Sequence, residues 1–129
     1  MTILSLPTAQ RIVAASQAAD AALDDDAFVA LLTPDVTFRF GSVNELHGRD
    51  AVRVAVRRLF DSLRGIRHTT RKLLIDGNEI FLQAEVEFMP IQGSPLTLPY
   101  VNVLTVEGDE RISRYLIHID ITPLFAGRG

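Results

Sequence analysis

The sequence predicts an α+β fold, with helices in its first half and mostly antiparallel strands in its second. Two observations lead to this prediction. Before residue 65, apolar residues recur mainly at helical spacing, and after it almost every segment alternates between apolar and polar positions, as a strand does. Helices and strands that segregate along the chain are typical of α+β domains. We therefore expect three N-terminal helices packed on a curved, mixed but mostly antiparallel sheet of four or five strands.

The composition is that of one globular domain over residues 1–129, with 47% hydrophobic and 22% charged residues and a net charge of −3. The absence of cysteine excludes disulfides and thiolate chemistry and fits a reducing compartment. The chain has no basic excess of the kind that nucleic-acid binders show. It has no recognisable signal peptide and no apolar segment of the roughly 20 residues that span a membrane. We expect a soluble, cytoplasmic protein with neither nucleic-acid nor membrane partners.

Local signals define the first two helices. Thr8 is the expected N-cap of a helix that reaches Leu23. The second helix covers residues 27–32 and stops before Pro34, because the residue that precedes a proline avoids helical backbone angles. The aspartates at 24–26 could hold a metal, but we favour a capping role, since carboxylates stabilise the positive end of a helix dipole.

A short strand and a third helix follow. Residues 36–40 alternate like a strand, with two phenylalanines on one face. The third helix covers residues 51–63, capped by Asp50 or a neighbour, and carries a buried apolar stripe. Four arginines lie off that stripe and either grip an anionic partner or, as we favour, face solvent. They are Arg53, Arg57, Arg58 and Arg64.

Three further strands are predicted at residues 68–75, 80–89 and 96–106. The first two are joined by Asp-Gly-Asn at 76–78, a sequence typical of hairpin turns. Pro99 makes the first half of the third strand an edge or a bulge. The even positions of the second strand are all apolar: Ile80, Leu82, Ala84, Val86 and Phe88.

The last strand, within residues 111–124, contains the strongest candidate site residue. A period of two places alternate side chains on opposite faces. One face carries Ser113, Tyr115, Ile117, Ile119 and Ile121, and the other carries Ile112, Arg114, Leu116, His118 and Asp120. We expect the first set to be core. The second set puts an imidazole and a carboxylate two residues apart, on a face that either meets solvent or lines a pocket.

The register of the final hairpin decides which residues join that second face. An even-length loop at residues 108–109 would place Thr97, Pro99, Val101 and Val103 there, whereas a bulge would bring Tyr100 and Asn102. We favour the even loop.

Several motifs point to a known family. They are Thr-Pro-Asp-Val-Thr-Phe at 33–38, His-Gly-Arg-Asp-Ala-Val at 47–52, Arg-Leu-Phe at 58–60, His68, Ala-Glu-Val-Glu-Phe at 84–88, Ile-Ser-Arg-Tyr at 112–115 and Ile-Asp-Ile at 119–121. Together they resemble the NTF2-like superfamily, especially the SnoaL-like polyketide cyclases and limonene-1,2-epoxide hydrolase. The resemblance implies a cone-shaped NTF2-like (cystatin-like) fold with a small-molecule site at its mouth. It also implies a homodimer through the sheet face.

The resemblance also assigns roles to particular residues. It implies that Asp120 faces the pocket and does acid–base work, and that Glu87 lies at the second catalytic carboxylate of the epoxide hydrolase. Three departures weaken the likeness to that enzyme. Glu85 stands where its bridging arginine is expected, and Phe38 and Phe40 replace the tyrosine and asparagine that hold its water. We therefore do not expect epoxide hydrolysis by that mechanism.

A lone aspartate in an apolar cone can act as a general base if burial raises its pKa. The catalytic candidates are Asp120, His118, His68 and Glu87, and the ligand-binding candidates are Phe38, Phe40, Met89 and Leu116. For His118 the alternative is a half-exposed sheet residue, and for Glu87 it is a solvated or dimer-facing surface. The spacing of histidines and acids matches no metal motif, so neither a metal nor a cofactor is expected.

Two hypotheses about function follow. The first is a cofactor-independent SnoaL-like enzyme in which Asp120 abstracts a proton α to a carbonyl on a hydrophobic, cyclic or polyketide-like substrate. Because no tyrosine lies on an early helix, His68 or His118 would have to stabilise the oxyanion. The second is a non-catalytic NTF2-like module that binds a small apolar molecule or dimerises.

Overall fold

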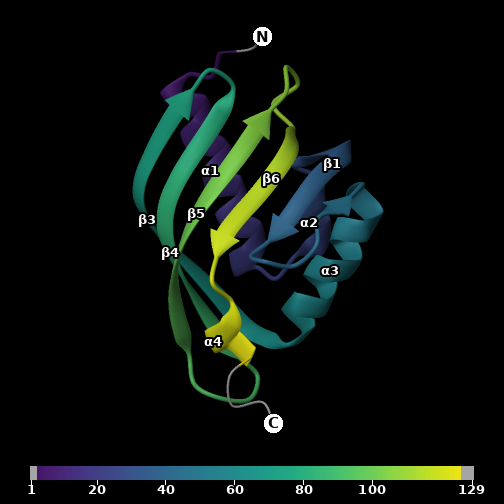
Figure 1. Ribbon diagram of the computed structural model, residues 1–129, viewed down its shortest axis with the longest axis vertical. Coiled ribbons are helices and arrows are strands. Elements are labelled where there is room, and N and C mark those ends of the chain that lie inside the picture. Colours follow the sequence, from purple (N-terminus) through teal and green to yellow (C-terminus); the bar gives the residue numbers. More distant parts are fainter. Residues whose placement is uncertain (1–2, 126–129) are drawn as a thin grey trace.

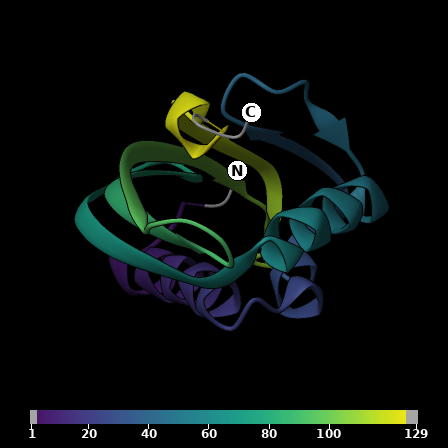
Figure 2. The same cartoon turned by 90° about the horizontal axis from the view of Figure 1, so that it is seen from below.

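In the computed structural model, which describes residues 3–125, three helices pack against one face of a curved six-stranded sheet (Figures 1 and 2). These three helices are α1 (Leu6–Ala21), α2 (Asp25–Val29) and α3 (Arg49–Asp61). A fourth, short helix, α4 (Thr122–Phe125), follows the last strand. The strands are β1 (Leu32–Phe40), β2 (Leu46–His47), β3 (Leu63–Asp76), β4 (Glu79–Pro90), β5 (Leu96–Val106) and β6 (Ile112–Ile119). The predicted α+β class is confirmed.

The strand order is β2-β1-β6-β5-β4-β3, and only β1 and β6 pair in parallel. The sheet is therefore mixed but mostly antiparallel, as predicted. Its curvature is plain in Figure 2, where the strands bend towards the side on which α1 and α3 lie. No helix among residues 3–125 is long and apolar enough to cross a membrane.

The helix boundaries differ from the predictions in ways that capping explains. α1 begins before Thr8, because Ser5 is its N-cap and accepts a hydrogen bond from the Thr8 amide at 3.2 Å. Asp24 caps α2 by accepting from the Ala27 amide at 3.0 Å, so the predicted capping role is confirmed for this aspartate. α3 begins after Gly48, which has φ +90° and provides no side-chain cap, so the prediction of Asp50 as cap is wrong.

The predicted second helix is also too long, because its last residue starts a strand. Leu32 pairs with Ile112 of β6, and the ladder between β1 and β6 shifts register between Leu32 and Thr37. Pro34 lies inside this irregular stretch, where its missing amide hydrogen removes no ladder bond. The bulge thus lets β1 extend four residues earlier than the alternation predicted.

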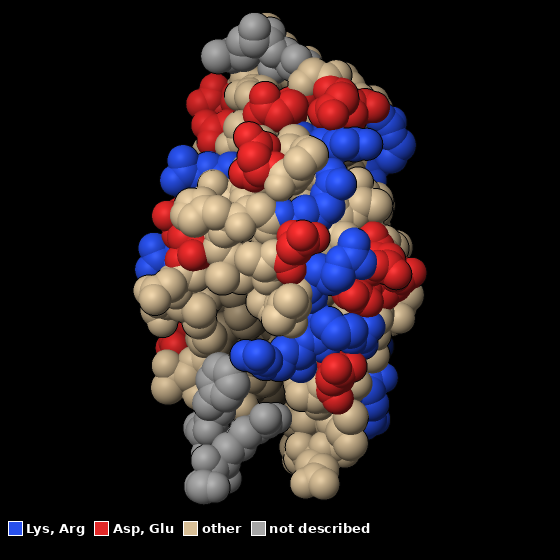
Figure 3. Space-filling view, turned by 90° about the vertical axis from the view of Figure 1, so that its right-hand side faces the viewer, with Lys and Arg blue, Asp and Glu red and all other residues tan. Residues whose placement is uncertain are grey.

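Two arginines of α3 pair with acids of the same chain. Arg53 bonds to Asp26, and Arg57 bonds to Asp25 at 2.8 Å and to Asp61 at 3.0 Å. Figure 3 shows basic and acidic side chains interleaved over this side of the molecule. This arrangement supports the interpretation of a solvated face rather than a site for an anionic partner.

The alternation of β4 is confirmed in full. Its five even-numbered residues are each no more than 3% exposed, and they face the helices. The odd-numbered side chains lie on the other face, which α1, α2 and α3 do not cover. We call the helix-covered face the inner face and the opposite face the outer face.

The two faces of β6 are divided as predicted from Arg114 onward, but Ile112 is fully buried, because the ladder with β5 shifts register between Thr105 and Val106. The pocket lies on the face that was expected to be core. Tyr115, Ile117 and Ile119 lie on the inner face, whereas Leu116 and His118 lie on the outer face. Core and pocket share one face because the helices cover only one side of the sheet. The expectation that the face of His118 and Asp120 lines the pocket is therefore wrong.

We predict that residues on the two faces of β4 respond differently to truncation. Leu82→Ala should lower the free energy of unfolding by about 2–5 kcal/mol, because Leu82 is 1% exposed and its removal leaves a cavity. Gln83→Ala, on the exposed outer face, should change it by less than about 0.5 kcal/mol. Urea denaturation of both variants measures the difference, and equal losses would contradict the assignment of faces.

Candidate functional site

A cavity of about 150 Å³ lies between the inner face of the sheet and the helices. Most of its wall is apolar and comes from α2, α3, the loop after β1 and five strands. The apolar lining residues are Phe28, Phe38, Phe40, Val43, Leu46, Ala55, Val56, Leu59, Phe60, Ile66, Val86, Phe88, Ile117 and Ile119. The polar lining residues are Asp20, Asn44, His68, Tyr100, Asn102 and Tyr115.

Aromatic rings shape the apolar wall. The ring of Tyr115 packs against Phe28 and Phe38, with centroids 5.3 and 5.6 Å apart, and Phe40 meets Phe88 edge-on at 6.5 Å. The predicted ligand-binding residues Phe38 and Phe40 thus line the cavity, although their contact with a ligand stays a prediction. Rings packed in this way hold one another in place and keep the wall rigid.

Three polar residues from three different elements form a chain at one end of the cavity. His68 of β3 lies 2.9 Å from Asp20 of α1, measured from Nε2 to Oδ2. Its other ring nitrogen, Nδ1, lies 2.8 Å from the Tyr100 hydroxyl on β5. The side chains of Asp20 and His68 are only 16% and 11% exposed, so the chain is shielded from water.

The chemistry of the three groups sets the direction of these hydrogen bonds. An ionised Asp20 can only accept, so Nε2 of His68 carries the hydrogen and Nδ1 is left to accept from the Tyr100 hydroxyl. Burial raises the pKa of Asp20, and the hydrogen bond from His68 opposes that rise. Burial also raises the pKa of Tyr100 to about 12, so this hydroxyl keeps its proton at neutral pH.

A second polar group lies beside this chain. The hydroxyls of Ser16 on α1 and Tyr115 on β6 are 2.6 Å apart. Burial raises the pKa of Tyr115 well above its ordinary value, so its hydroxyl too stays protonated. Asn102 on β5 is 5% exposed and lines the cavity next to these groups.

The register of β5 and β6 explains why Tyr100 and Asn102 point inward. Val101 pairs with His118 and Val103 with Leu116, so the predicted grouping of these side chains on one face is confirmed. That face is the outer one. Tyr100 and Asn102, which only the bulge alternative placed in the pocket, therefore lie in it.

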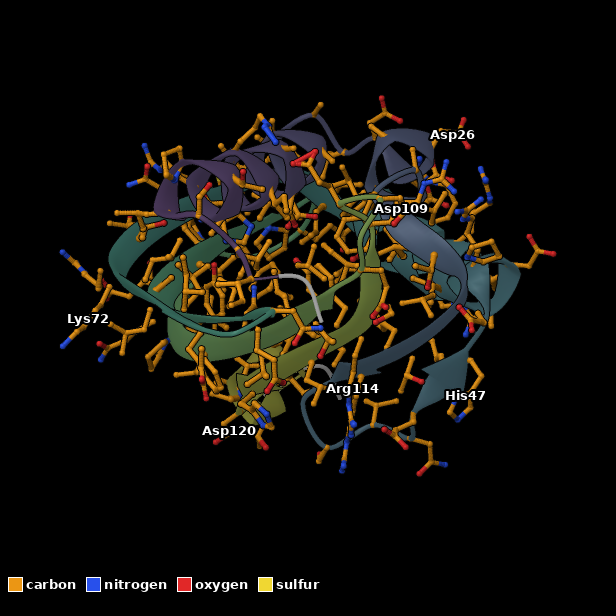
Figure 4. The ribbon with its side chains drawn as sticks, turned by 90° about the horizontal axis from the view of Figure 1, so that it is seen from above. Asp26, His47, Lys72, Asp109, Arg114 and Asp120 are labelled. Atoms are coloured by element: carbon orange, nitrogen blue, oxygen red, sulfur yellow. The ribbon has the colours of Figure 1, made fainter. Side chains whose placement is uncertain are left out.

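Asp120 lies outside the cavity, contrary to the prediction. Its carboxylate is exposed and accepts a hydrogen bond from the Thr122 amide at 3.0 Å, at the start of α4. Hydrogen bonds from the Thr122 hydroxyl and amide lower its pKa, whereas a buried general base needs a raised one. Figure 4 shows Asp120 on the side of the sheet away from α1.

Other predicted site residues also lie on the outer face. Glu87 pairs with Arg67 at 2.6 Å, and His118 is exposed beside Leu116. Met89 is on the outer side of β4, where its methyl group would meet a Cβ placed on Gly65. None of these four lines the cavity. Of the predicted catalytic residues, only His68 does.

The sequence contained a signal for the residues that were missed. Ser16 and Asp20 are four residues apart and continue the buried stripe of α1, which also contains Ile12 and Val13. Polar residues on an otherwise apolar helix face are candidates for a buried site. For Tyr100 and Asn102 the sequence offered only the alternative of a bulge, because their inward direction depends on which sheet face the helices cover.

Within residues 3–125, His, Asp and Glu side chains do not gather in groups of three or more that could hold an ion.

Comparison with known families identifies the domain. The model of the SnoaL-like domain matches residues 9–115. The chain belongs to the SnoaL-like domain family. Comparison with curated proteins found no significant match.

Several solved structures share the fold of this SnoaL-like protein. An LEH-like epoxide hydrolase from M. tuberculosis is 20% identical, with a TM-score of 0.77 over 94% of this chain and 89% of that one. An NTF2-like protein from Anabaena variabilis is 19% identical, with a TM-score of 0.80 over 93% and 94%. TerC, co-crystallised with polyporic acid, is 18% identical, with a TM-score of 0.76 over 91% and 95%. At these identities the likeness shows the fold alone.

The placements of Asp20 and Asp120 predict opposite effects of pH on stability. The raised pKa of Asp20 gives a contribution that is complete below about pH 3.8 and is lost as pH rises through the raised value. The lowered pKa of Asp120 gives a contribution that is present above about pH 3.8 and is lost as pH falls. Asp20→Asn should therefore gain stability relative to the wild type as pH rises, and Asp120→Asn should lose it.

Urea denaturation of the wild type and the two variants between about pH 3 and pH 7 measures these trends. The exposed Asp120 serves as the internal control for the buried Asp20. A stability difference between Asp20→Asn and the wild type that stays constant with pH would contradict the burial of the Asp20 carboxylate.

Proposed function

We propose that this SnoaL-like protein binds a small cyclic molecule and catalyses cofactor-independent proton transfer next to a carbonyl group. The observation that supports the proposal is the shielded chain of Asp20, His68 and Tyr100 at one end of an otherwise apolar cavity. Buried titratable groups that gather in a cavity mark a candidate functional site.

The size of the cavity limits the substrate. A volume of about 150 Å³ is comparable to that of engineered apolar cavities that take up benzene. A one-ring substrate fits inside, whereas a larger molecule has to extend through the mouth. The co-crystal of TerC with polyporic acid supports the idea that this fold can hold an organic ligand.

The hydrogen-bonded chain provides a path for the proton. As the substrate carbon gives its proton to the Tyr100 oxygen, the Tyr100 hydroxyl passes its own proton to Nδ1 of His68. The resulting imidazolium is stabilised by the carboxylate of Asp20. Tyr100 never has to exist as a free phenolate, which its pKa of about 12 would disfavour. Reversal of the same steps returns a proton to a different atom of the substrate.

This assignment replaces Asp120 with His68 as the base. Epoxide hydrolysis is not the reaction that we propose, although an epoxide hydrolase shares the fold. Among the described lining residues Asp20 supplies the only carboxylate, and Phe38 and Phe40 offer no group that could hold a water.

A second candidate function is a binding module without catalysis. It is favoured by the wall of the cavity, where the described lining residues away from the Asp20–His68–Tyr100 chain are almost all apolar. The two candidates agree on a small cyclic ligand and differ only in whether the proton moves.

Hydrogen–deuterium exchange of cyclohexanone in heavy water tests the catalytic proposal. Loss of the α-proton signals, followed by NMR, should be faster with the wild type than in buffer. His68→Gln and Tyr100→Phe should each reduce the protein-catalysed rate by at least about 100-fold, because each interrupts the proton path.

His47→Gln is the matched control, since His47 is exposed and lies away from the cavity (Figure 4). It should exchange cyclohexanone at the wild-type rate. If cyclohexanone binds but exchanges no faster than in buffer, the protein is the binding module and the catalytic proposal fails.

Assembly into a homodimer through the outer face also remains a prediction, and a row of apolar side chains supports it. Leu74 pairs with Phe81, Phe81 with Val103, and Val103 with Leu116, so one row crosses four strands. Leu74 is 54% exposed. A continuous apolar row on an uncovered sheet face is typical of a protein interface.

A charge in this row should prevent dimerisation. Val103→Asp should convert a dimer to a monomer, because a second copy would bury the carboxylate without a partner. Val103→Thr, which keeps the shape, is the control. Light scattering coupled to gel filtration measures the mass, and a monomeric wild type would contradict the prediction.

A further inference from the structure

One buried acceptor in the site has no hydrogen-bond partner. The side-chain oxygen of Asn102, Oδ1, is buried and unpaired, although the residue is only 5% exposed. Leaving a buried acceptor unpaired costs free energy, so such an atom in a native protein needs an explanation. Thr33 and Arg49 also carry unpaired buried atoms, but neither residue borders the cavity. Of these three residues, Asn102 is therefore the one that borders the cavity.

Two spaces border Asn102 from which a donor could come. One is the cavity of about 150 Å³, and the other is a void of about 10 Å³ between α1 and the sheet. The volume of this void is at the lower limit for one water molecule. A water there would also need two to four polar partners.

The polar groups around the small void are already paired. Ser16 bonds to Tyr115, and Gln17 bonds to Thr70 at 3.0 Å. Asp20 bonds to His68, as described above. A water in the void would have to compete with these bonds, so the cavity is the better source of a donor.

We propose that Asn102 determines substrate specificity by accepting a hydrogen bond from an O–H or N–H group of the ligand. The inference rests on the proposed function, because it concerns the same cavity. The Tyr100 hydroxyl donates to His68, and the Tyr115 hydroxyl is paired with Ser16. Asn102 thus provides the free neutral acceptor at the polar end. The favoured ligand is a ring that carries a hydroxyl, an enol or an N–H, rather than a plain hydrocarbon or an ether.

Three probes of similar size test the proposal: phenol, which has a donor; anisole, which has only an acceptor; and toluene, which has neither. Calorimetric or NMR titration of the wild type should give a dissociation constant for phenol about tenfold lower than that for anisole. Anisole and toluene should bind about equally.

Substitution of the acceptor should remove this preference. Asn102→Leu keeps the approximate volume but has no acceptor, so phenol and anisole should bind this variant equally. Ile117→Val is the matched control, because it trims the apolar wall and should weaken all three probes by a similar factor while phenol stays preferred.

A measurement on the wild type keeps the test independent of whether Asn102→Leu folds. The side-chain amide resonances of Asn102 should shift on titration with phenol and stay in place with anisole. A shift of other side-chain amides in place of Asn102 would overturn the proposal.

The remaining outcomes separate this inference from the proposed function. Equal binding of phenol and anisole by the wild type overturns the inference alone, and a phenol preference that survives in Asn102→Leu does the same. A preference for anisole over toluene, with none for phenol, would mean that the Asn102 amide presents its N–H group, and it too overturns the inference. If no probe binds, the ligand-binding premise of the proposed function fails as well.

Discussion

Helices α1, α2 and α3 cover one face of the sheet, and the rest of the structure depends on that constraint. A sheet buried on one side must place its apolar residues there, and its curvature then creates a hollow on the same side. Core and cavity are consequently continuous: Phe38, Tyr115 and Phe88 belong to the core and also line the cavity. The outer face is left with ion pairs, such as that of Arg71 with Glu85, and with the apolar row that crosses four strands.

Within the hollow, polar groups are concentrated where α1 ends against β3 and β5. Asp20 comes from the last turn of the helix, His68 from the long strand that follows α3, and Tyr100 from the centre of the sheet. Each of these groups alone would be costly to bury, but together they satisfy one another. The hydrogen bonds that lower the free-energy cost of burying these groups also order them as a path for a proton. Stability and the proposed chemistry therefore depend on the same contacts.

A fold does not by itself determine a function, which depends on the residues of the site. Glu85, at the position where the bridging arginine of the epoxide hydrolase is expected, lies on the outer face and pairs with Arg71. Phe38 and Phe40 make this part of the cavity wall apolar. The polar set of this chain, from Asp20 to Asn102, lies in other elements. Similarity of fold to an epoxide hydrolase is thus compatible with a different reaction.

The sequence by itself determined the class of fold, the identity of most elements and the division of each strand into two faces. It could do so because helical and strand periodicities are local properties of the chain: the even residues of β4 are buried as their alternation required. Only the tertiary structure decided which face became the pocket. The alternation of β6 is symmetric, since either face could be covered, and the choice depends on where distant helices pack. For that reason His68 was found from the sequence, Asp120 was placed on the wrong side, and Asp20, Tyr100 and Asn102 emerged only when α1 was seen against the sheet.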